Sequence, residues 1–182
     1  DTSIITVANN ILRGNNASTD THRGIILRNT GNESVAYVYN NLVYDISQNN
    51  TVDSAGIIPS GGNWTAYIYN NTVINMAYGF SLPDNGQTAI FQNNLTQECR
   101  TGFDASWAFS DDSDYNLSSN DSAPGANSIT NATVQFVDET NNDFHLSPND
   151  TTAIDAGTSS PASNPLLRGV AGGRGVSYDI DG

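Results

Sequence analysis

The segments ITVANN at 5–10, AYVYNN at 36–41, AYIYNN at 66–71 and AIFQNN at 89–94 are four copies of one pattern, apolar-x-apolar-x-Asn-Asn. The first Asn of each copy stands at positions 9, 40, 70 and 93, so successive copies lie 31, 30 and 23 residues apart. A second motif, Gly followed by an apolar residue, alternates with the first at 24–25, 56–57, 79–80 and 102–103. Two motifs that advance together at similar periods indicate an internal repeat.

Aligning the four copies produces columns of apolar residues. Two positions before the Asn pair, the column is Val7, Val38, Ile68 and Phe91. Four positions before it, the column is Ile5, Ala36, Ala66 and Ala89. This period of two is typical of a strand with one buried face, so we expect Val7, Val38, Ile68 and Phe91 to be buried and stacked.

The repeat predicts an all-β fold in which each turn of chain, here called a coil, adds one strand to each parallel sheet. A helix would repeat its apolar positions at three and four, and hairpins would need two-residue Asn-Gly or Asp-Gly turns, of which the repeats hold only Asn85-Gly86. We expect one domain over 1–182, with about four regular coils over 1–110 and a last irregular coil and tail over 111–182.

The Asn pairs are placed where the chain turns sharply between sheets. Asn tolerates the left-handed backbone conformation, and its side-chain amide can bond to an Asn in the coil above or below. We therefore predict an Asn ladder along the molecule, with the side chain of Asn94 facing inward.

Composition limits the classes of partner. The chain has no lysine and six arginines against 19 acidic residues, for a net charge of −13. Nucleic acid and anionic membranes would repel it. No apolar run reaches the roughly 20 residues that span a bilayer, so we expect no membrane insertion. The single cysteine, Cys99, cannot form an internal disulfide.

Ten Asn-x-Ser/Thr triplets indicate a secreted N-glycosylated protein, with an extracellular or cell-surface location. Asn94 is excluded as a glycan site by its place in the ladder. The candidate glycosylation sites are Asn16, Asn32, Asn49, Asn63, Asn70, Asn116, Asn120, Asn131 and Asn149.

The Gly-Ile and Asn-Asn columns resemble the right-handed parallel β-helix repeats of the pectate-lyase-like superfamily. YNLSS at 115–119, the segment at 134–157 and DIDG at 179–182 resemble the carboxyl-terminal end of many secreted bacterial β-helix proteins. The resemblance covers nearly the whole chain and implies a right-handed β-helix of which this chain is the carboxyl-terminal portion. It leaves function open, because the fold hosts lyases, hydrolases, epimerases, adhesins and fibre proteins.

No residues qualify as catalytic or metal-binding, and we expect no cofactor. Resemblance to the uronic-acid lyases would imply acidic calcium ligands and a basic residue, and the nearest grouping is Arg100 with Glu98 and Asp104. The acidic run of Asp111, Asp112 and Asp114 is weakly compatible with calcium. A surface charge pair is the favoured explanation of the first grouping, and solvated loop acids are the favoured explanation of the second.

Aromatic residues suggest a contact surface for a carbohydrate or a partner protein. Tyr37 and Tyr67 should stack in one outward column and Tyr39 and Tyr69 in another, with Trp64 in the preceding loop. Cross-strand stabilisation alone would also explain these tyrosines.

Two classes of function follow. The first is a structural or adhesive protein, such as a filament or surface-layer subunit that self-assembles. The second is a fragment of a polysaccharide lyase or glycoside hydrolase, and a carbohydrate-binding module is a further alternative. The strand-like start at Ile4, Ile5 and Val7 predicts a first coil with nothing beneath it, covered by a longer precursor or a neighbouring subunit. We expect a neighbour, contacted by 160–182 or by the tyrosines.

Overall fold

The computed structural model describes residues 3–14, 20–28, 33–46, 54–84 and 86–158. The candidate sites Asn16, Asn32 and Asn49, and the segment 160–182 expected at a subunit contact, lie outside these residues. The described chain is all-β apart from one short 3-10 turn, Glu139–Asn141. No helix in this part of the chain is long and apolar enough to span a membrane.

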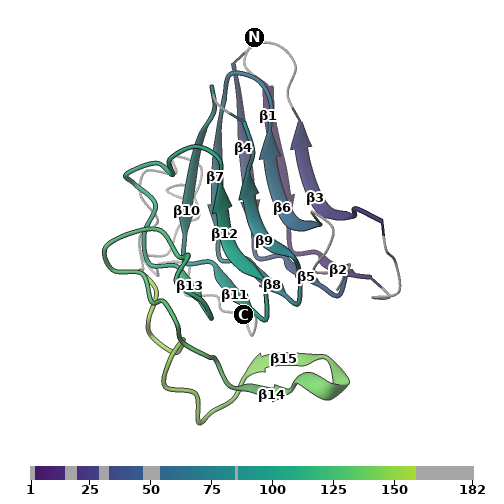
Figure 1. Ribbon diagram of the computed structural model, residues 1–182, viewed down its shortest axis with the longest axis vertical. Helices are drawn as coiled ribbons and strands as arrows, with labels where there is room; N and C mark the ends of the chain where they lie inside the picture. Colours follow the sequence, from purple (N-terminus) through teal and green to yellow (C-terminus); the bar gives the residue numbers. More distant parts are fainter. Residues whose placement is uncertain (1–2, 15–19, 29–32, 47–53, 85, 159–182) are drawn as a thin grey trace, which may run out of the picture.

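Three parallel sheets hold thirteen of the described strands (Figure 1). Along the chain, the first twelve strands enter these sheets in strict rotation, and the thirteenth is a further strand of the second sheet. The first sheet holds β1 (Ser3–Ala8), β4 (Ser34–Tyr39), β7 (Trp64–Tyr69) and β10 (Thr88–Gln92). The second holds β2 (Ile11–Arg13), β5 (Leu42–Tyr44), β8 (Thr72–Ile74), β11 (Leu95–Gln97) and β13 (Leu117–Ser118). The third holds β3 (Arg23–Arg28), β6 (Ala55–Ser60), β9 (Tyr78–Leu82) and β12 (Thr101–Ala105). Parallel strands stacked in this way are consistent with a β-solenoid.

The register matches the columns read from the sequence. Val7 pairs with Val38, Val38 with Ile68, and Ile68 with Phe91. Val38, Ile68 and Phe91 are fully buried, and Val7 is half-buried because β1 lies at the edge of its sheet. The predicted apolar column is therefore confirmed, with partial exposure only at its first member.

The glycine of the Gly-apolar motif is needed for close packing between sheets. A Cβ built on Gly56 would lie 2.4 Å from Cγ1 of Val73, and one built on Gly79 would lie 2.6 Å from Cγ2 of Thr96. The second and third sheets therefore approach each other too closely for any larger residue at these positions. The following residues, Ile57 and Phe80, are fully buried.

The predicted Asn ladder is confirmed. The first Asn of each pair has a left-handed backbone, with φ of 59°, 54°, 50° and 56° at Asn9, Asn40, Asn70 and Asn93. The side chain of the second Asn donates from Nδ2 to Oδ1 of the next, over 2.9 to 3.0 Å. The five members of the ladder are Asn10, Asn41, Asn71, Asn94 and Asn116.

An antiparallel hairpin follows the parallel sheets, formed by β14 (Phe136–Asp138) and β15 (Asp143–Leu146). Phe144 is buried against Tyr44, with ring centroids 4.9 Å apart, and Phe136 packs beside it. The hairpin therefore covers the outer face of the second sheet. It lies within 111–182, the stretch in which the sequence predicts an irregular coil and tail.

Candidate functional site

The carboxyl-terminal end of the parallel sheets is closed by residues 106–129, here called the cap, which includes β13. Ser113 Oγ accepts from the backbone N–H of Phe91 over 3.1 Å, and Ser122 Oγ accepts from the N–H of Phe103 over 2.9 Å. The ring of Phe109 lies edge-on to Phe91 at 5.4 Å and is partly buried against the core. The cap thus occupies both the strand edges and the apolar interior at this end.

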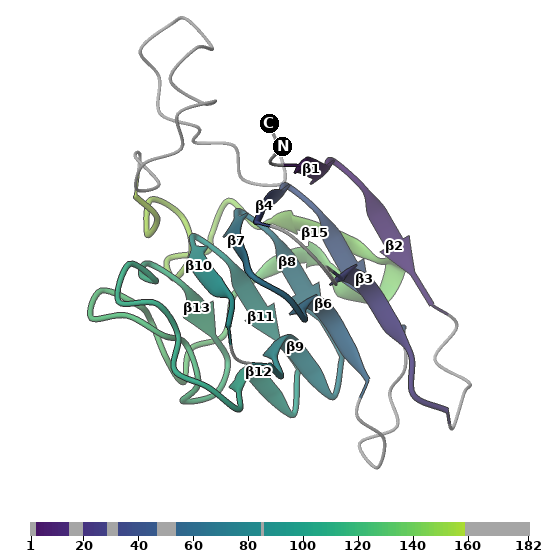
Figure 2. The same cartoon turned by 90° about the horizontal axis from the view of Figure 1, so that it is seen from above.

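At the opposite end, no described residues lie beyond the first coil. The first coil consists of β1, β2 and β3, and each of these is the terminal strand of its sheet (Figure 2). Ile5 faces inward in register with the fully buried Ala36, yet its own side chain is 39% exposed. On the outward positions, Ile4 is 61% and Ile11 is 74% exposed. The first coil therefore presents both unpaired strand edges and apolar side chains.

The Asn ladder ends differently at the two ends. At the cap, Nδ2 of Asn116 donates to the backbone carbonyls of Phe91, Asp114 and Pro124, and the side chain is fully buried. At the first coil, Asn10 is exposed and donates into the ladder, but its Oδ1 receives no hydrogen bond from the described residues. Each inner Oδ1 accepts from the Asn of the preceding coil, so Oδ1 of Asn10 is positioned to accept from one further layer.

The tyrosines stack as predicted but are much less exposed than a contact surface requires. Tyr37 and Tyr67 are in register, with ring centroids 5.2 Å apart and planes within 9°. Tyr37 and Tyr69 are buried, while Tyr39 and Tyr67 are half-buried. Burial raises the pKa of Tyr69 well above its usual value.

The placement of Trp64 in a loop was wrong. Trp64 begins β7, is 3% exposed, and donates from Nε1 to Oε1 of Gln87 over 2.9 Å. Its position in the core follows from the alternation of β7, because Trp64 lies on the same inward face as Ala66 and Ile68. Trp64 is therefore unavailable for contact in the folded chain.

The candidate glycan sites within the described residues fall into two groups. Asn63, Asn131 and Asn149 are exposed. Asn70 is half-buried, Asn120 donates its amide to the carbonyls of Cys99 and Arg100, and Asn116 is fully buried at the end of the ladder. Asn94, which the sequence analysis excluded, is 1% exposed in the ladder.

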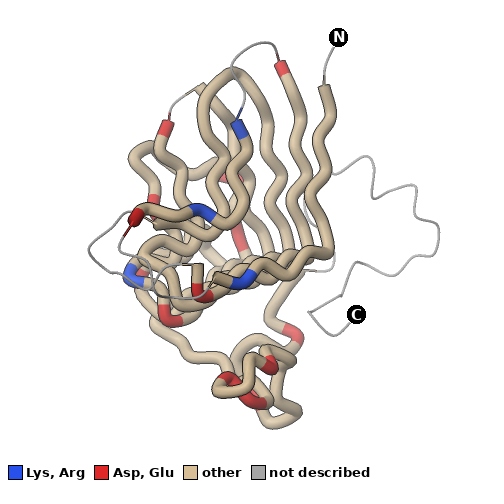
Figure 3. Tube along the Cα trace, turned by 90° about the vertical axis from the view of Figure 1, so that its right-hand side faces the viewer, with Lys and Arg blue, Asp and Glu red and all other residues tan. Residues whose placement is uncertain are grey.

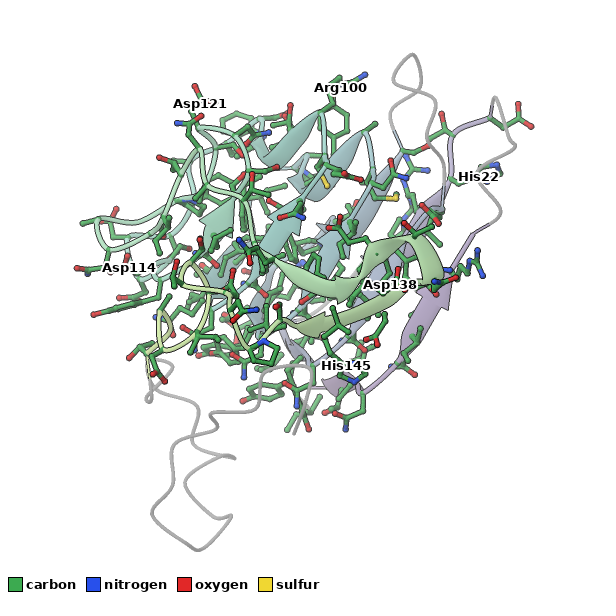
Figure 4. All side chains as sticks on the ribbon, turned by 90° about the horizontal axis from the view of Figure 1, so that it is seen from below. His22, Arg100, Asp114, Asp121, Asp138 and His145 are labelled. Carbon is green, nitrogen blue, oxygen red and sulfur yellow. The ribbon has the colours of Figure 1, made fainter. Side chains whose placement is uncertain are left out.

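The groupings considered for catalysis or calcium do not converge. Arg100 lies over the ring of Tyr78 at 4.6 Å, and Asp104 accepts from Ser81 Oγ over 3.2 Å. Burial alone would raise the pKa of the Asp114 carboxyl, but hydrogen bonds from Asn127 and from the N–H of Tyr115 together outweigh burial and lower it. Figure 4 shows His22, Arg100, Asp114 and His145 in separate parts of the molecule.

No cluster of three or more His, Cys, Asp or Glu side chains suited to a metal ion exists among the described residues. His145 hydrogen-bonds to Asp143, which lowers the pKa of that carboxyl. Cys99 is buried, and burial raises the pKa of its thiol to about 12. The thiol is therefore protonated at neutral pH, and a protonated thiol is a poor nucleophile.

A cavity of about 460 Å³ lies between the second sheet, the hairpin and residues 153–158, a feature for which the sequence provided no signal. Leu95 and Leu117 line it from the sheet, and Phe136 and Phe144 from the hairpin. Its amide lining consists of Asn70, Asn93, Asn94, Asn116 and Asn127. Such a cavity combines apolar surface with several hydrogen-bonding groups.

Comparisons with protein-family models, with curated proteins and with solved structures found no match. Function is therefore inferred from the geometry of this chain alone. The feature that sets one region apart is the first coil, beyond which no described strand lies, whereas the last strands of the sheets are covered by the hydrogen bonds of the cap and the ring of Phe109.

Proposed function

We propose that this chain is a structural or adhesive extracellular protein that self-assembles through its first coil, as a subunit of a filament or surface layer. One observation carries the proposal: the first coil consists of three edge strands, β1, β2 and β3, and its Ile4, Ile5 and Ile11 are exposed. Strand edges with exposed apolar side chains associate with other chains unless they are covered or blunted. In the proposed assembly, a neighbouring subunit covers these edges.

The proposed fold is a right-handed parallel β-helix of the kind found in the pectate-lyase-like superfamily. Its support is the resemblance of the Gly-Ile and Asn-Asn columns, together with the parallel register of the three sheets. Crossover connections between parallel strands are overwhelmingly right-handed, which favours the same hand here. A crystal structure in which the coils wind to the left would contradict the proposed handedness.

The proposed location is extracellular, with N-linked glycans on exposed sequons. Asn63, Asn131 and Asn149 support it, because their exposed side chains leave room for a glycan outside the strands. Mass spectrometry of the protein from its native source tests it, since secretion and glycosylation predict added hexose mass on peptides that contain these residues. If the native protein carries no glycan on any peptide, the proposed glycosylation is wrong.

Self-assembly is tested by light scattering and sedimentation of the purified chain at micromolar concentration. The expected result is a mass that rises with concentration. A variant with Ile4→Asp and Ile11→Asp should remain monomeric, because both substitutions place a charge on exposed apolar positions of the first coil. Ile154→Asp is the matched control, since Ile154 is 41% exposed but lies outside the first coil. A wild-type chain that stays monomeric at all concentrations would refute the proposal.

The cavity beneath the hairpin supports a second candidate function, the binding of a saccharide. Aromatic surface and amide groups are the usual combination for holding a sugar ring, and the volume falls in the range of small-ligand sites. Calorimetric titration with uronic-acid and neutral oligosaccharides tests it, with Asn127→Ala as the variant because Asn127 is exposed at the cavity. No heat from any oligosaccharide would dismiss this function.

A further inference from the structure

The two ends of the parallel sheets carry opposite charge. The described residues of the first coil, up to the start of β4, hold three arginines, Arg13, Arg23 and Arg28, all exposed, against two acids, Asp20 and Glu33. A fourth described arginine, Arg100, lies outside the first coil, after β11. In a chain with a net charge of −13, the first coil is thus locally basic.

The cap is locally acidic. Residues 106–129 contain four aspartates, Asp111, Asp112, Asp114 and Asp121, and no lysine or arginine. Asp114 is engaged by Asn127, but Asp111, Asp112 and Asp121 are exposed, and no described side chain donates a hydrogen bond to their carboxylates. In Figure 4, Asp114 and Asp121 lie at the side of the molecule opposite His22, which precedes β3. Figure 3 shows the distribution of both signs of charge along the chain.

The two ends also match in apolar surface. The cap exposes Trp107, at 51%, two residues after the end of β12. The first coil exposes Ile4, Ile11 and Ile26, at 61%, 74% and 40%. An interface between the two ends would pair opposite charges around apolar contacts, which is the usual arrangement of a protein interface.

A contact between the first coil and the cap depends on the charges local to each end and not on the net charge of the chain. Neighbouring strands are spaced about 4.8 Å apart, so four coils separate the two ends by about 20 Å. The screening length at physiological ionic strength is about 8 Å. Each end therefore interacts mainly with the charges directly opposite it, and the acids of the cap scarcely offset the arginines of the first coil.

We propose that copies of this chain associate head to tail, with the first coil of one copy against the cap of the next. The two surfaces are different, so each bound copy leaves a free first coil at one end and a free cap at the other, and the assembly grows without closing. A twofold contact between two first coils would instead oppose six arginines. The inference rests on the proposed self-assembly and specifies its geometry.

Charge reversal at each end provides the test, with sedimentation and light scattering as readouts. The variant Arg23→Glu with Arg28→Glu should lose association by at least about tenfold, because acids then face acids. The variant Asp111→Arg with Asp112→Arg should lose it equally. Combining all four substitutions in one chain should restore growth, since the charges are merely exchanged. Arg100→Glu, on an exposed arginine outside the first coil, is the control for the change in net charge and should assemble as the wild type does.

Mixing the two double variants gives the sharpest result. The first variant has acids at its first coil and at its cap, and the second has arginines at both. Each first coil in the mixture therefore finds a cap of opposite charge only on the other variant. The mixture should regain growth as an alternating assembly, whereas neither variant grows alone. Wild-type assemblies that stop at dimers, or that are unaffected by either double variant, would overturn the head-to-tail geometry while leaving self-assembly intact. A monomeric wild-type chain would instead refute the proposed function itself.

Discussion

The first and last coils of this molecule use the same strand pattern but differ in what lies beyond them. Val7 and Phe91 occupy the same inward column, yet Val7 is half-buried and Phe91 is fully buried. Beyond Phe91 stand Ser113 and Phe109 of the cap, whereas β1 is the edge of its sheet. The burial of a residue in a stacked fold therefore depends on the next layer as much as on the residue itself.

The same contrast governs polar groups. Asn71 donates to Oδ1 of Asn94 and to the carbonyls of Val38 and Tyr69, and it accepts from the backbone N–H and the amide of Asn41. Asn10 stands at the exposed end of this ladder. In stacked proteins stability is roughly a sum of coil and neighbour terms, so the first coil should open before the others do.

The largest expected effect is on the apolar column. Phe91→Ala should lower the free energy of unfolding by about 3–5 kcal/mol, because it removes a fully buried ring that contacts Phe80, Phe103 and Phe109. Val7→Ala in the same column should cost less than half as much, since Val7 already contacts solvent. Urea unfolding followed by circular dichroism measures both. Equal losses would show that the first coil is covered in solution.

The next effect concerns the Asn ladder. Asn71→Ala should destabilise the fold by about 2–4 kcal/mol, because it removes the buried hydrogen bonds that the Asn71 amide donates to Val38, Tyr69 and Asn94 and those that its Oδ1 accepts from Asn41. Asn10→Ala should cost under about 1 kcal/mol, as its neighbours can bond to water. Thermal unfolding compares the two variants under identical conditions. A loss at Asn10 as large as that at Asn71 would contradict the assignment of Asn10 to an exposed ladder end.

A smaller effect is expected from Asp150, which holds the segment that follows the hairpin. Asp150 is 4% exposed; burial raises the pKa of its carboxyl, but hydrogen bonds from the N–H groups of Gln135, Ala153, Ile154 and Thr152 outweigh burial and lower it. A lowered pKa in the folded state means that the stabilisation is present above the usual carboxyl pKa of about 3.9 and is lost as pH falls through the folded value.

Asp150→Asn should therefore cost about 1–3 kcal/mol at pH 7, and the difference from wild type should shrink below about pH 4. Urea unfolding at a series of pH values measures it. Asp155→Asn, on an exposed residue five positions later, is the control and should change stability little at any pH. A wild-type advantage that persists undiminished at pH 2 would rule out ionisation of Asp150 as its source.

The smallest effect on stability is expected from glycans. Asn63→Gln removes an exposed sequon and should remove one glycan without changing unfolding, whereas peptides that contain Asn94 should carry none. Mass spectrometry and thermal unfolding of the native protein measure these outcomes. A glycan on Asn94 would be incompatible with its 1% exposure in the folded ladder.

Much of the fold could be read from the sequence because a stacked fold repeats its constraints. The apolar columns, the left-handed Asn9, Asn40, Asn70 and Asn93, and the inward Asn94 all follow from residues that recur at matching places in successive coils. Asn116 was missed as the fifth ladder member because it lies in YNLSS, where the preceding residues do not follow the repeat. Its spacing of 22 residues from Asn94 could have identified it.

The parallel register follows from the sequence alone, since period-two columns and Asn turns admit one alignment of neighbouring coils. The exposure of the outward side chains does not, because it depends on segments distant in the chain. Tyr69 and Trp64 were expected on a surface and are buried, while the cavity lined by Leu95 and Phe136 exists only because the hairpin docks there. The unequal ends have the same physical origin, since the cap closes one end through contacts that no local pattern encodes.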